Sequence, residues 1–214
     1  MRDILPFLDK YPSIILLDVG FHKGDFSRDF SKRISPLNKY LHVIGIDPID
    51  YGSESCNVFI KAAVSTQEGV RIFNTYSEPG CNSLNEMLLE NKFQRPQEIQ
   101  KTGEIEVNCE RLDRILDALN PEFIHYFKID AQGNDRDVLQ SGEKWLPKCL
   151  FVQMETCVAK TADTLMYKNQ NTRDSDIEYM LSKDFELFDE WDHSAVSCPE
   201  ADLIFFNRKL YDEN

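Results

Sequence analysis

Five short runs of apolar residues constrain the fold of this chain more than any other feature of its sequence. A strand with one solvated face alternates apolar and polar residues, whereas these runs are apolar on both sides, which is typical of parallel strands covered by helices on both faces. Two further runs follow toward the C-terminus. The seven predicted strands are Ile14–Asp18, Val43–Asp47, Val58–Val64, Ile124–Asp130, Leu150–Glu155, Phe185–Phe188 and Leu203–Phe206.

Segments with helical spacing of apolar residues fill most of the gaps between these strands. Ser83-x-x-Glu86 and Ser175-x-x-Glu178 match capping boxes, which predict helix N-termini. Strands that alternate with helices through the whole chain predict one doubly wound α/β domain over residues 1–214. The apolar sets are Phe26, Phe30 and Ile34; Leu84, Met87 and Leu88; Leu112, Ile115, Leu116 and Leu119; and Ile177, Met180 and Leu181.

Two connections depart from regular alternation. Only the ten residues Pro48–Asn57 separate the second and third strands, which is too few for a helical crossover, so a bare loop is expected there. The longer stretch that follows predicts an extra hairpin of Val70–Tyr76 with Ile105–Asn108. An antiparallel pair at one edge fits the last two strands.

Composition excludes several classes of function. The 24 Lys and Arg against 37 Asp and Glu give a formal charge of −13, and nucleic-acid binding needs a basic face that no Lys/Arg cluster supplies. No apolar run approaches the roughly 18 residues of a membrane span, and the N-terminus lacks a signal-peptide pattern. Six scattered cysteines without a C-x-x-C pair predict reduced thiols. A cytoplasmic protein that binds neither membrane nor nucleic acid is expected.

The first motif that carries chemistry is the segment DVGFHKGD, which ends one strand and opens a helix. Gly20 and Gly24 allow a sharp turn against a ligand, and the helix that follows presents free N–H groups. The G-x-x-x-G spacing matches neither the dinucleotide fingerprint nor the P-loop. A nucleotide site and a plain tight turn both remain open.

The next strands also end in acids. Asp47, followed by Pro48, comes about 25 residues after Gly20, near the spacing of a ribose-binding carboxylate, although a solvated strand-end residue gives the same pattern. Four acids in all terminate strands at one edge of the predicted sheet, where like charges raise one another's pKa. A cationic ligand, a metal or Lys128 can relieve that repulsion. The four are Asp18, Asp47, Asp130 and Glu155.

Taken together, these blocks resemble the FkbM-type branch of class I S-adenosylmethionine (SAM)-dependent methyltransferases. The resemblance rests on DVGFHKGDFS, VIGIDP, KAAVS, NSL, VNCERLDRIL, FKIDAQGNDRDVLQSGE and VQMET in this order, from Leu16 to about Phe206. It implies a Rossmann-like class I methyltransferase fold with a mostly parallel seven-stranded sheet of order 3-2-1-4-5-7-6, one antiparallel edge strand and a reduced second-strand crossover. The implied activity is O-methylation of a hydroxyl, often on a sugar or glycan.

The resemblance also implies a SAM site. Asp18, Gly20 and Gly24 would frame the methionine end of SAM, and Asp47 would bind its ribose. Phe21 and His22 stand where the family usually has a small residue and Asn. Ser83 has a second interpretation as a helix cap. The complete set of predicted cofactor residues is Asp18, Gly20, Phe21, His22, Gly24, Asp47, Pro48, Ala62, Ala63, Asn82 and Ser83.

Catalytic and substrate residues are expected beyond the methionine end of SAM. Asp130 is the first candidate for the base that takes the hydroxyl proton, Glu155 is the second, and Lys128 can hold either Asp130 or a substrate oxygen. A divalent cation on Asp130, Asp135 and Glu155 is a less favoured alternative. The loops Cys157–Asp174 and Trp191–Pro199 are expected to select the acceptor. The predicted substrate contacts are Gln132, Asn134, Asp135, Tyr167, Trp191 and His193.

Two other classes of function stay open. A nicotinamide (NAD)-dependent oxidoreductase also uses a glycine turn and a strand-end acid, but the glycine spacing differs from the dinucleotide fingerprint. A non-catalytic module could keep the fold without the cofactor. The sequence predicts neither the identity of the acceptor nor the oligomeric state.

Overall fold

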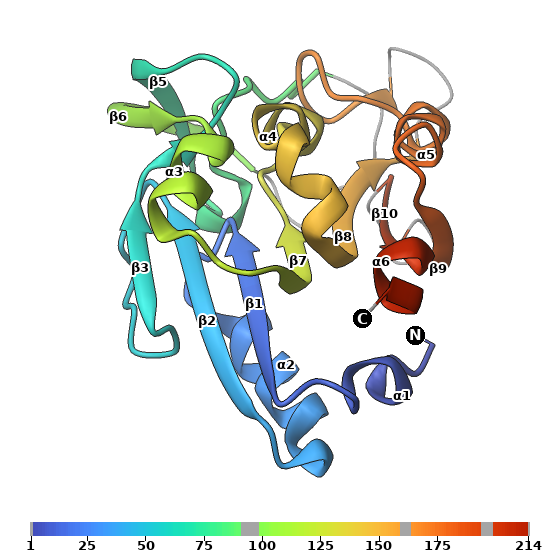
Figure 1. Ribbon diagram of the computed structural model, residues 1–214. Helices are drawn as coiled ribbons and strands as arrows, with labels where there is room; N and C mark the ends of the chain where they lie inside the picture. The colour runs from blue at the N-terminus through green and yellow to red at the C-terminus, as the bar shows by residue number, and fades with distance from the viewer. Residues whose placement is uncertain (1, 91–98, 159–163, 194–198, 214) are drawn as a thin grey trace.

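Seven strands form one twisted sheet with helices on both faces in the computed structural model, which describes residues 2–90, 99–158, 164–193 and 199–213 (Figure 1). Each predicted strand is present, with slightly different ends. The strands of this main sheet are β1 Ser13–Val19, β2 Tyr40–Asp47, β3 Val58–Lys61, β7 Ile124–Ile129, β8 Cys149–Cys157, β9 Glu186–Asp192 and β10 Glu200–Phe206.

The order of the main sheet is β3-β2-β1-β7-β8-β10-β9. Numbered along the chain, this is 3-2-1-4-5-7-6, as the resemblance implied. Neighbouring strands from β3 to β8 are parallel, and β10 is antiparallel to both β8 and β9. The antiparallel strand therefore lies next to the edge, and β9 forms the edge itself. Because β2 and β7 lie on either side of β1, the strand order reverses at β1, which is where ligands bind in open α/β sheets.

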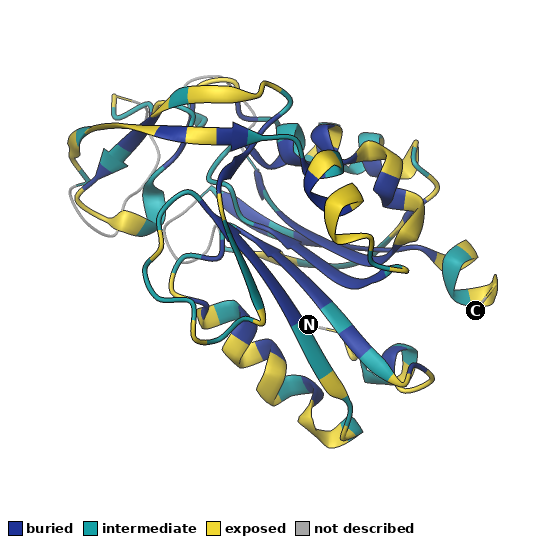
Figure 2. Ribbon diagram, turned by 60° about the vertical axis from the view of Figure 1, so that its left-hand side comes forward, coloured by how far each residue is buried: buried dark blue, intermediate teal, exposed yellow. Residues whose placement is uncertain are grey.

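Two apolar layers hold the helices to the sheet. On one face of the sheet, Leu17 and Val19 of β1 belong to an apolar cluster with residues of the helices α3 (Leu112–Leu119), α4 (Asp135–Ser141) and α5 (Arg173–Leu181). On the other face, Ile14 and Leu16 belong to a cluster with residues of α1 (Leu5–Leu8), α2 (Asp25–Ile34) and α6 (Arg208–Glu213). Figure 2 shows the buried strands between these exposed helices. The helices are α1 Leu5–Leu8, α2 Asp25–Ile34, α3 Leu112–Leu119, α4 Asp135–Ser141, α5 Arg173–Leu181 and α6 Arg208–Glu213, with 3-10 turns at Ser35–Leu37, Pro79–Cys81 and Glu143–Lys148.

A second, three-stranded sheet lies beyond the carboxyl end of β3. The predicted strand Val58–Val64 divides at Ala62, so that β3 stays in the main sheet and β4 (Ala63–Val64) pairs with β6 (Lys101–Glu110). β6 also pairs antiparallel with β5 (Gly69–Tyr76), which confirms the predicted extra pair. The small sheet stands above the end of β3 in Figure 1 and closes one side of the space over the main sheet.

Both predicted capping boxes are wrong. No helix forms over residues 83–88, because Ser83 instead pairs with Asn74 as an isolated bridge and its hydroxyl donates to the carbonyl of Gln132 at 2.7 Å. In the second case, α5 already begins at Arg173, so Ser175 lies inside its first turn and donates to the carbonyl of Thr172. Both hydroxyls found backbone acceptors that local sequence does not reveal.

The connection between β2 and β3 contains no helix in the described residues 48–57, as its length predicted. Cys56, Cys81, Cys109 and Cys149 are free thiols, and Cys198 lies outside the described residues. Among the described helices, none has the length and apolar character needed to cross a membrane.

Candidate active site

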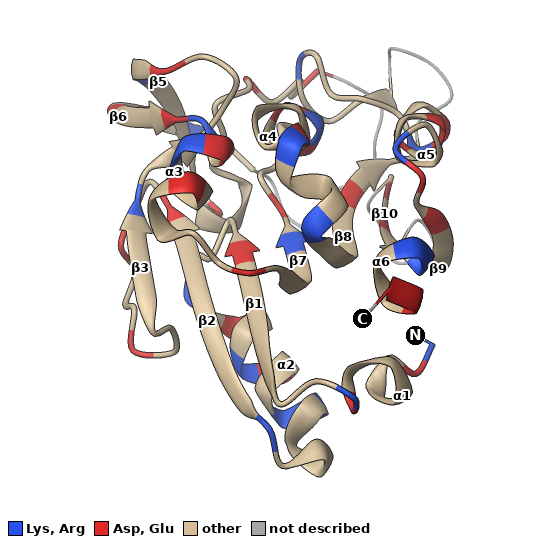
Figure 3. Cartoon of the chain, viewed as in Figure 1, with Lys and Arg blue, Asp and Glu red and all other residues tan. Residues whose placement is uncertain are grey.

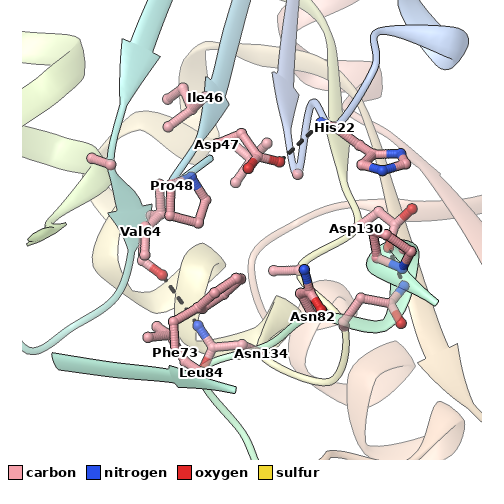
Figure 4. Close-up of a pocket in the computed structure, with 18 of the residues that line it drawn as sticks. His22, Ile46, Asp47, Pro48, Val64, Phe73, Asn82, Leu84, Asp130 and Asn134 are labelled. Atoms are coloured by element: carbon pink, nitrogen blue, oxygen red, sulfur yellow. Dashed lines mark hydrogen bonds between the residues drawn. The ribbon is translucent and has the colours of Figure 1, made fainter. Parts of the chain in front are cut away.

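A pocket of about 680 Å³ opens at the carboxyl ends of β1, β2 and β7, at the predicted reversal point of the sheet (Figure 4). Turns after these strands form its floor, and the segment from β3 to β5 forms a wall. Its lining residues are Val19, Gly20, His22, Ile46, Asp47, Pro48, Tyr51, Ala62, Ala63, Val64, Phe73, Pro79, Gly80, Asn82, Leu84, Asp130, Ala131, Gln132 and Asn134.

Gly20 brings two of these turns together. Its φ of +77° lies in the left-handed region, and a Cβ at this position would overlap the carbonyl oxygen of Asp130. The N–H groups of Gly20 and Phe21 both donate to the carbonyl of Ile46, which ties the end of β1 to β2. A residue without a side chain is therefore required at the point where the turns after β1 and β7 meet.

Three predicted cofactor residues support this turn from behind instead of lining the pocket. The Phe21 ring is 2% exposed and packs over Gly24 and Gly45. Asp18 is fully buried, accepts from the Ser27 hydroxyl at 2.7 Å and lies 3.4 Å from the Lys128 ammonium. Asp18, Phe21 and Gly24 are therefore not among the residues that line the pocket, and their predicted contact with a cofactor stays a prediction.

Asp47 lies at the floor of the pocket, and its two oxygens each accept one backbone N–H. His22 donates to Oδ2 and Ile49 donates to Oδ1, both at 2.9 Å. Burial raises the pKa of Asp47 from the ordinary 3.8 to about 6, although these two donors lower it. Each oxygen keeps a further lone pair, so the carboxylate can still accept hydrogen bonds from the hydroxyl groups of a ligand.

Above Asp47, one wall is apolar and the opposite side is polar. Ala62 and Ala63 line the wall as predicted, together with Phe73 and Leu84 from the small sheet and the segment after it. Asn82 lines the pocket and donates to the Tyr51 hydroxyl at 3.0 Å. An apolar wall of this kind suits one face of a planar base.

Tyr51, Phe73 and Leu84 are lining residues that sequence reasoning missed. The signal for Tyr51 was its place in the helix-free connection after Asp47, where a large aromatic side chain has little local structure to pack against. Its ring centroid lies 4.7 Å from that of His22. Burial lowers the pKa of His22, so its ring is neutral at pH 7. The buried Nε2 of His22 has no hydrogen-bond partner among the described residues.

Ser83 and Asn134, two further predicted contacts, have internal partners. Ser83 is fully buried behind the lining residues, bonded to the carbonyl of Gln132, and does not line the pocket. Asn134 does line it, but its amide donates to the carbonyl of Val64 at 3.1 Å, which fastens the turn after β7 to β4 (Figure 4). Asn134 therefore joins two walls.

A charged group occupies the other end of the pocket. Lys128 lies 3.4 Å from both Asp18 and Asp130 and donates to the carbonyl of Gly20 at 3.1 Å. Burial lowers the pKa of Lys128, but the Asp130 and Asp18 carboxylates outweigh burial and hold it above its usual range. Figure 3 shows basic colour on β7 between the acidic ends of β1 and β8. Lys128 is thus a structural cation that fixes Asp130.

Glu155 and Asp135 stand behind Asp130. Burial, followed by repulsion from carboxylates led by Glu200, raises the pKa of Glu155 well above its usual range. Burial likewise raises the pKa of Asp135, whose Oδ1 accepts the N–H of Ala131 at 3.2 Å. Asp135 is buried and braces the turn, and it does not line the pocket; its predicted contact with substrate stays a prediction. Within the described residues, no group of three His, Cys, Asp or Glu side chains is placed to hold a metal ion.

Gln132 lines the pocket, whereas three other predicted substrate contacts lie outside it. Tyr167 is fully buried, and its hydroxyl lies 2.7 Å from Oε1 of Gln132. Trp191 is 57% exposed on β9, and Nε2 of His193 lies 2.8 Å from Asp202. The predicted contacts of Tyr167, Trp191 and His193 with substrate are therefore not formed by this pocket. Residues 159–163 and 194–198 of the two predicted selectivity loops lie outside the described residues.

Comparisons with known proteins agree with this architecture. A family model described as the methyltransferase FkbM domain matches residues 18–192. The 2-O-methyltransferase NoeI of Sinorhizobium fredii (strain NBRC 101917 / NGR234) is 24% identical over 225 residues, which cover 98% of this chain and 85% of NoeI.

Among solved structures, the methyltransferase FkbM from Methylobacillus flagellatus KT is similar in fold, with a TM-score of 0.50 and 12% identity. The similarity covers 90% of this chain, which spans 44% of the length of that protein. Since the family model matches more than half of the chain, the chain belongs to the FkbM methyltransferase family.

Proposed function

We propose that this protein is a SAM-dependent O-methyltransferase that acts on a hydroxyl group of a sugar or glycan. One observation carries the proposal: the pocket places an acceptor carboxylate, Asp47, at the end of β2 and a second carboxylate, Asp130, after β7, on either side of β1. A nucleoside that binds the first would extend toward the second. The name of NoeI, a 2-O-methyltransferase, supports an oxygen acceptor.

The lining residues fit SAM in three parts. Asp47 would accept the ribose hydroxyls, and the space between Ala62–Ala63 and Phe73 would take the adenine. The turn of Gly20 and His22 would hold the methionine end, where the buried Nε2 of His22 offers a polar atom that still lacks a partner. Bound SAM would supply an electrophilic methyl group on a sulfonium.

The chain's own contribution to the reaction is orientation and proton removal. Methyl transfer is an in-line displacement, and holding the reacting atoms in line removes much of the entropic barrier. Asp130 lines the pocket with its side chain 36% exposed, so it can reach an incoming hydroxyl. It would accept the hydroxyl proton as the oxygen attacks, a role that contributes about 10²–10⁴-fold in typical enzymes.

Glu155 is less suited to be the base. Its carboxyl does not line the pocket, and Gln132 lies between it and Asp130. Burial raises the pKa of its carboxyl well above the usual range. The two predicted candidates are thus ordered by geometry, with Asp130 at the pocket and Glu155 behind it.

The experiment is a transfer assay with SAM labelled in its methyl group and a panel of monosaccharides and glycans. Thermal-shift titrations with SAM, S-adenosylhomocysteine and NAD run beside it. We expect stabilisation by the two adenosyl compounds and label in at least one hydroxyl product. Stabilisation by NAD alone would indicate an oxidoreductase, and no response to any of the three would indicate a non-catalytic module; either result overturns the proposal.

A further inference from the structure

Gln132 makes an unusual set of contacts at the edge of the pocket. Its side-chain Nε2 donates to Oδ1 of Asp130 at 2.6 Å and to Oε2 of Glu155 at 3.1 Å. A primary amide has two N–H groups, so both are committed to carboxylates. The predicted direct contact between Gln132 and substrate would need a donor that is already in use. The amide instead forms a bridge between the pocket carboxylate and the one behind it.

The far side of the amide is fixed as well. The Tyr167 hydroxyl lies 2.7 Å from Oε1 of Gln132 and 3.0 Å from the carbonyl of Cys81, and its single proton serves the shorter contact. Reversing the amide would aim its oxygen at Asp130 and Glu155, which need donors. Tyr167 is fully buried, so its position is set by packing. The orientation of the Gln132 amide is therefore determined from both sides.

The backbone at Gln132 is also held in a costly conformation. Its φ is +53°, in the left-handed region, which costs a residue with a side chain about 1–2 kcal/mol. The hydroxyl of Ser83 donates to its carbonyl at 2.7 Å and stabilises this conformation. Strain that surrounding contacts maintain in this way is concentrated at functional sites.

We propose that Gln132 is the positioning residue of the reaction, a bridge that fixes the Asp130 carboxylate toward the acceptor, and that Tyr167 fixes the bridge. The proposal rests on the function proposed above. Lys128 holds Oδ2 of Asp130 at 3.4 Å and Gln132 holds Oδ1, so the two contacts together define the plane of the carboxylate.

The test uses Gln132→Met, which keeps the volume but removes both donors, Gln132→Glu, which replaces the donors with a third carboxylate, and Tyr167→Phe. Gln140→Met on the exposed side of α4 is the matched control. We expect SAM affinity within about twofold of wild type for all four. Turnover should fall about 10- to 100-fold in Gln132→Met with KM for the acceptor unchanged, which is part of the usual contribution of a general base.

Two further readouts separate positioning from simple structural support. In Gln132→Glu the acidic limb of the kcat–pH profile should move to higher pH, because the added negative charge disfavours ionisation of its neighbours. Tyr167→Phe should lower kcat about threefold, and the double variant Gln132→Met/Tyr167→Phe should lose no more than Gln132→Met alone, since the two side chains act as one unit. Full additivity, an unchanged kcat in Gln132→Met, or a raised acceptor KM alone would overturn the proposal.

A direct probe distinguishes failure of this proposal from failure of the proposed function. The side-chain ¹³C resonance of Asp130 is titrated by NMR in wild type, Gln132→Glu and Gln140→Met, with no SAM present. The bridge predicts a higher titration midpoint for Asp130 in Gln132→Glu and no change in the control. Identical midpoints refute the bridge even if wild type transfers methyl groups, whereas a shifted midpoint without any SAM binding refutes only the methyltransferase assignment.

Discussion

Replacing Asp47 with Asn tests the electrostatics of the pocket through the stability of the unliganded protein. The Asp47 side chain is almost fully buried, and burial raises its pKa from 3.8 to about 6. Between these two values the folded chain binds a proton at this position more tightly than the unfolded chain does. The stability that comes from this proton is present at low pH and is lost as the pH rises through about 6.

The magnitude follows from the two pKa values. A difference of one pH unit is worth 1.36 kcal/mol, so a change from 3.8 to about 6 amounts to about 3 kcal/mol. Asn does not titrate and lacks this dependence. It leaves either His22 N–H or Ile49 N–H facing an amide NH₂, at a cost of about 1–3 kcal/mol that is the same at every pH. The unfolding free energy of the variant relative to wild type should therefore rise by about 2–3 kcal/mol from pH 4 to pH 8.

The assay is urea denaturation at several pH values between 4 and 8, followed by circular dichroism and by tryptophan fluorescence. Asp50→Asn, in the same connection but exposed, is the matched control and should differ from wild type by no more than about 0.5 kcal/mol throughout. A difference between Asp47→Asn and wild type that stays constant over this range, or that moves in favour of wild type as the pH rises, would refute the reasoning.

Three further outcomes are expected. SAM affinity should fall as the pH drops below about 6, by up to tenfold per pH unit, because ribose binding uses ionised Asp47. In equilibrium dialysis, SAM affinity of Asp47→Asn should not change with pH in this way. An equal pH dependence in both proteins would contradict the assignment of Asp47 to the ribose. In thermal unfolding, Gly20→Ala should destabilise the fold by more than about 3 kcal/mol. Gly69→Ala is the control, because Gly69 also has a positive φ but open space around it, and it should cost about 1–2 kcal/mol. Equal losses of stability in the two variants would show that the overlap with the Asp130 carbonyl is unimportant. Asp130→Asn should keep SAM affinity and lower kcat by about 10²-fold or more, and full activity on the acceptor would exclude it as the base.

The strands of the main sheet could be predicted because a strand that is buried on both faces has apolar residues at most of its positions, a pattern that the local sequence shows directly. The runs that became β1, β2, β7 and β8 are mostly apolar with little alternation, so their place in a parallel sheet followed from the sequence itself. The helix-free connection after Asp47 followed from its length. The strand order came from the resemblance to the FkbM family, since the apolar pattern alone does not order strands.

Contacts between distant residues could not be predicted in the same way. Ser83 carried a correct local signal for a helix cap, but its hydroxyl binds the carbonyl of Gln132, 49 positions away. Tyr167 looked like a surface aromatic in a polar loop, yet it is buried against the same residue. Phe73 reaches the pocket through β5, and the pairing that places it depends on β6.

The four acids at strand ends share one sequence pattern, but only two of them line the pocket. Four acids at one edge suggested a shared ligand, and Asp47 and Asp130 do line one pocket. Asp18 is instead buried against Ser27 and Lys128, and Glu155 is held behind Gln132. Whether a strand-end acid faces a ligand or a neighbouring element depends on the side of the sheet toward which it projects, and that is settled by the packing of α2 and of the turn after β7.

The most direct measurement is a crystal structure of the protein with S-adenosylhomocysteine. The account predicts ribose hydroxyl oxygens about 2.6–3.2 Å from the Asp47 carboxylate, the adenine between Ala62–Ala63 and Phe73, and the sulfur facing Asp130. An empty pocket in crystals grown at saturating ligand, or a nucleoside bound without contact to Asp47, would contradict it.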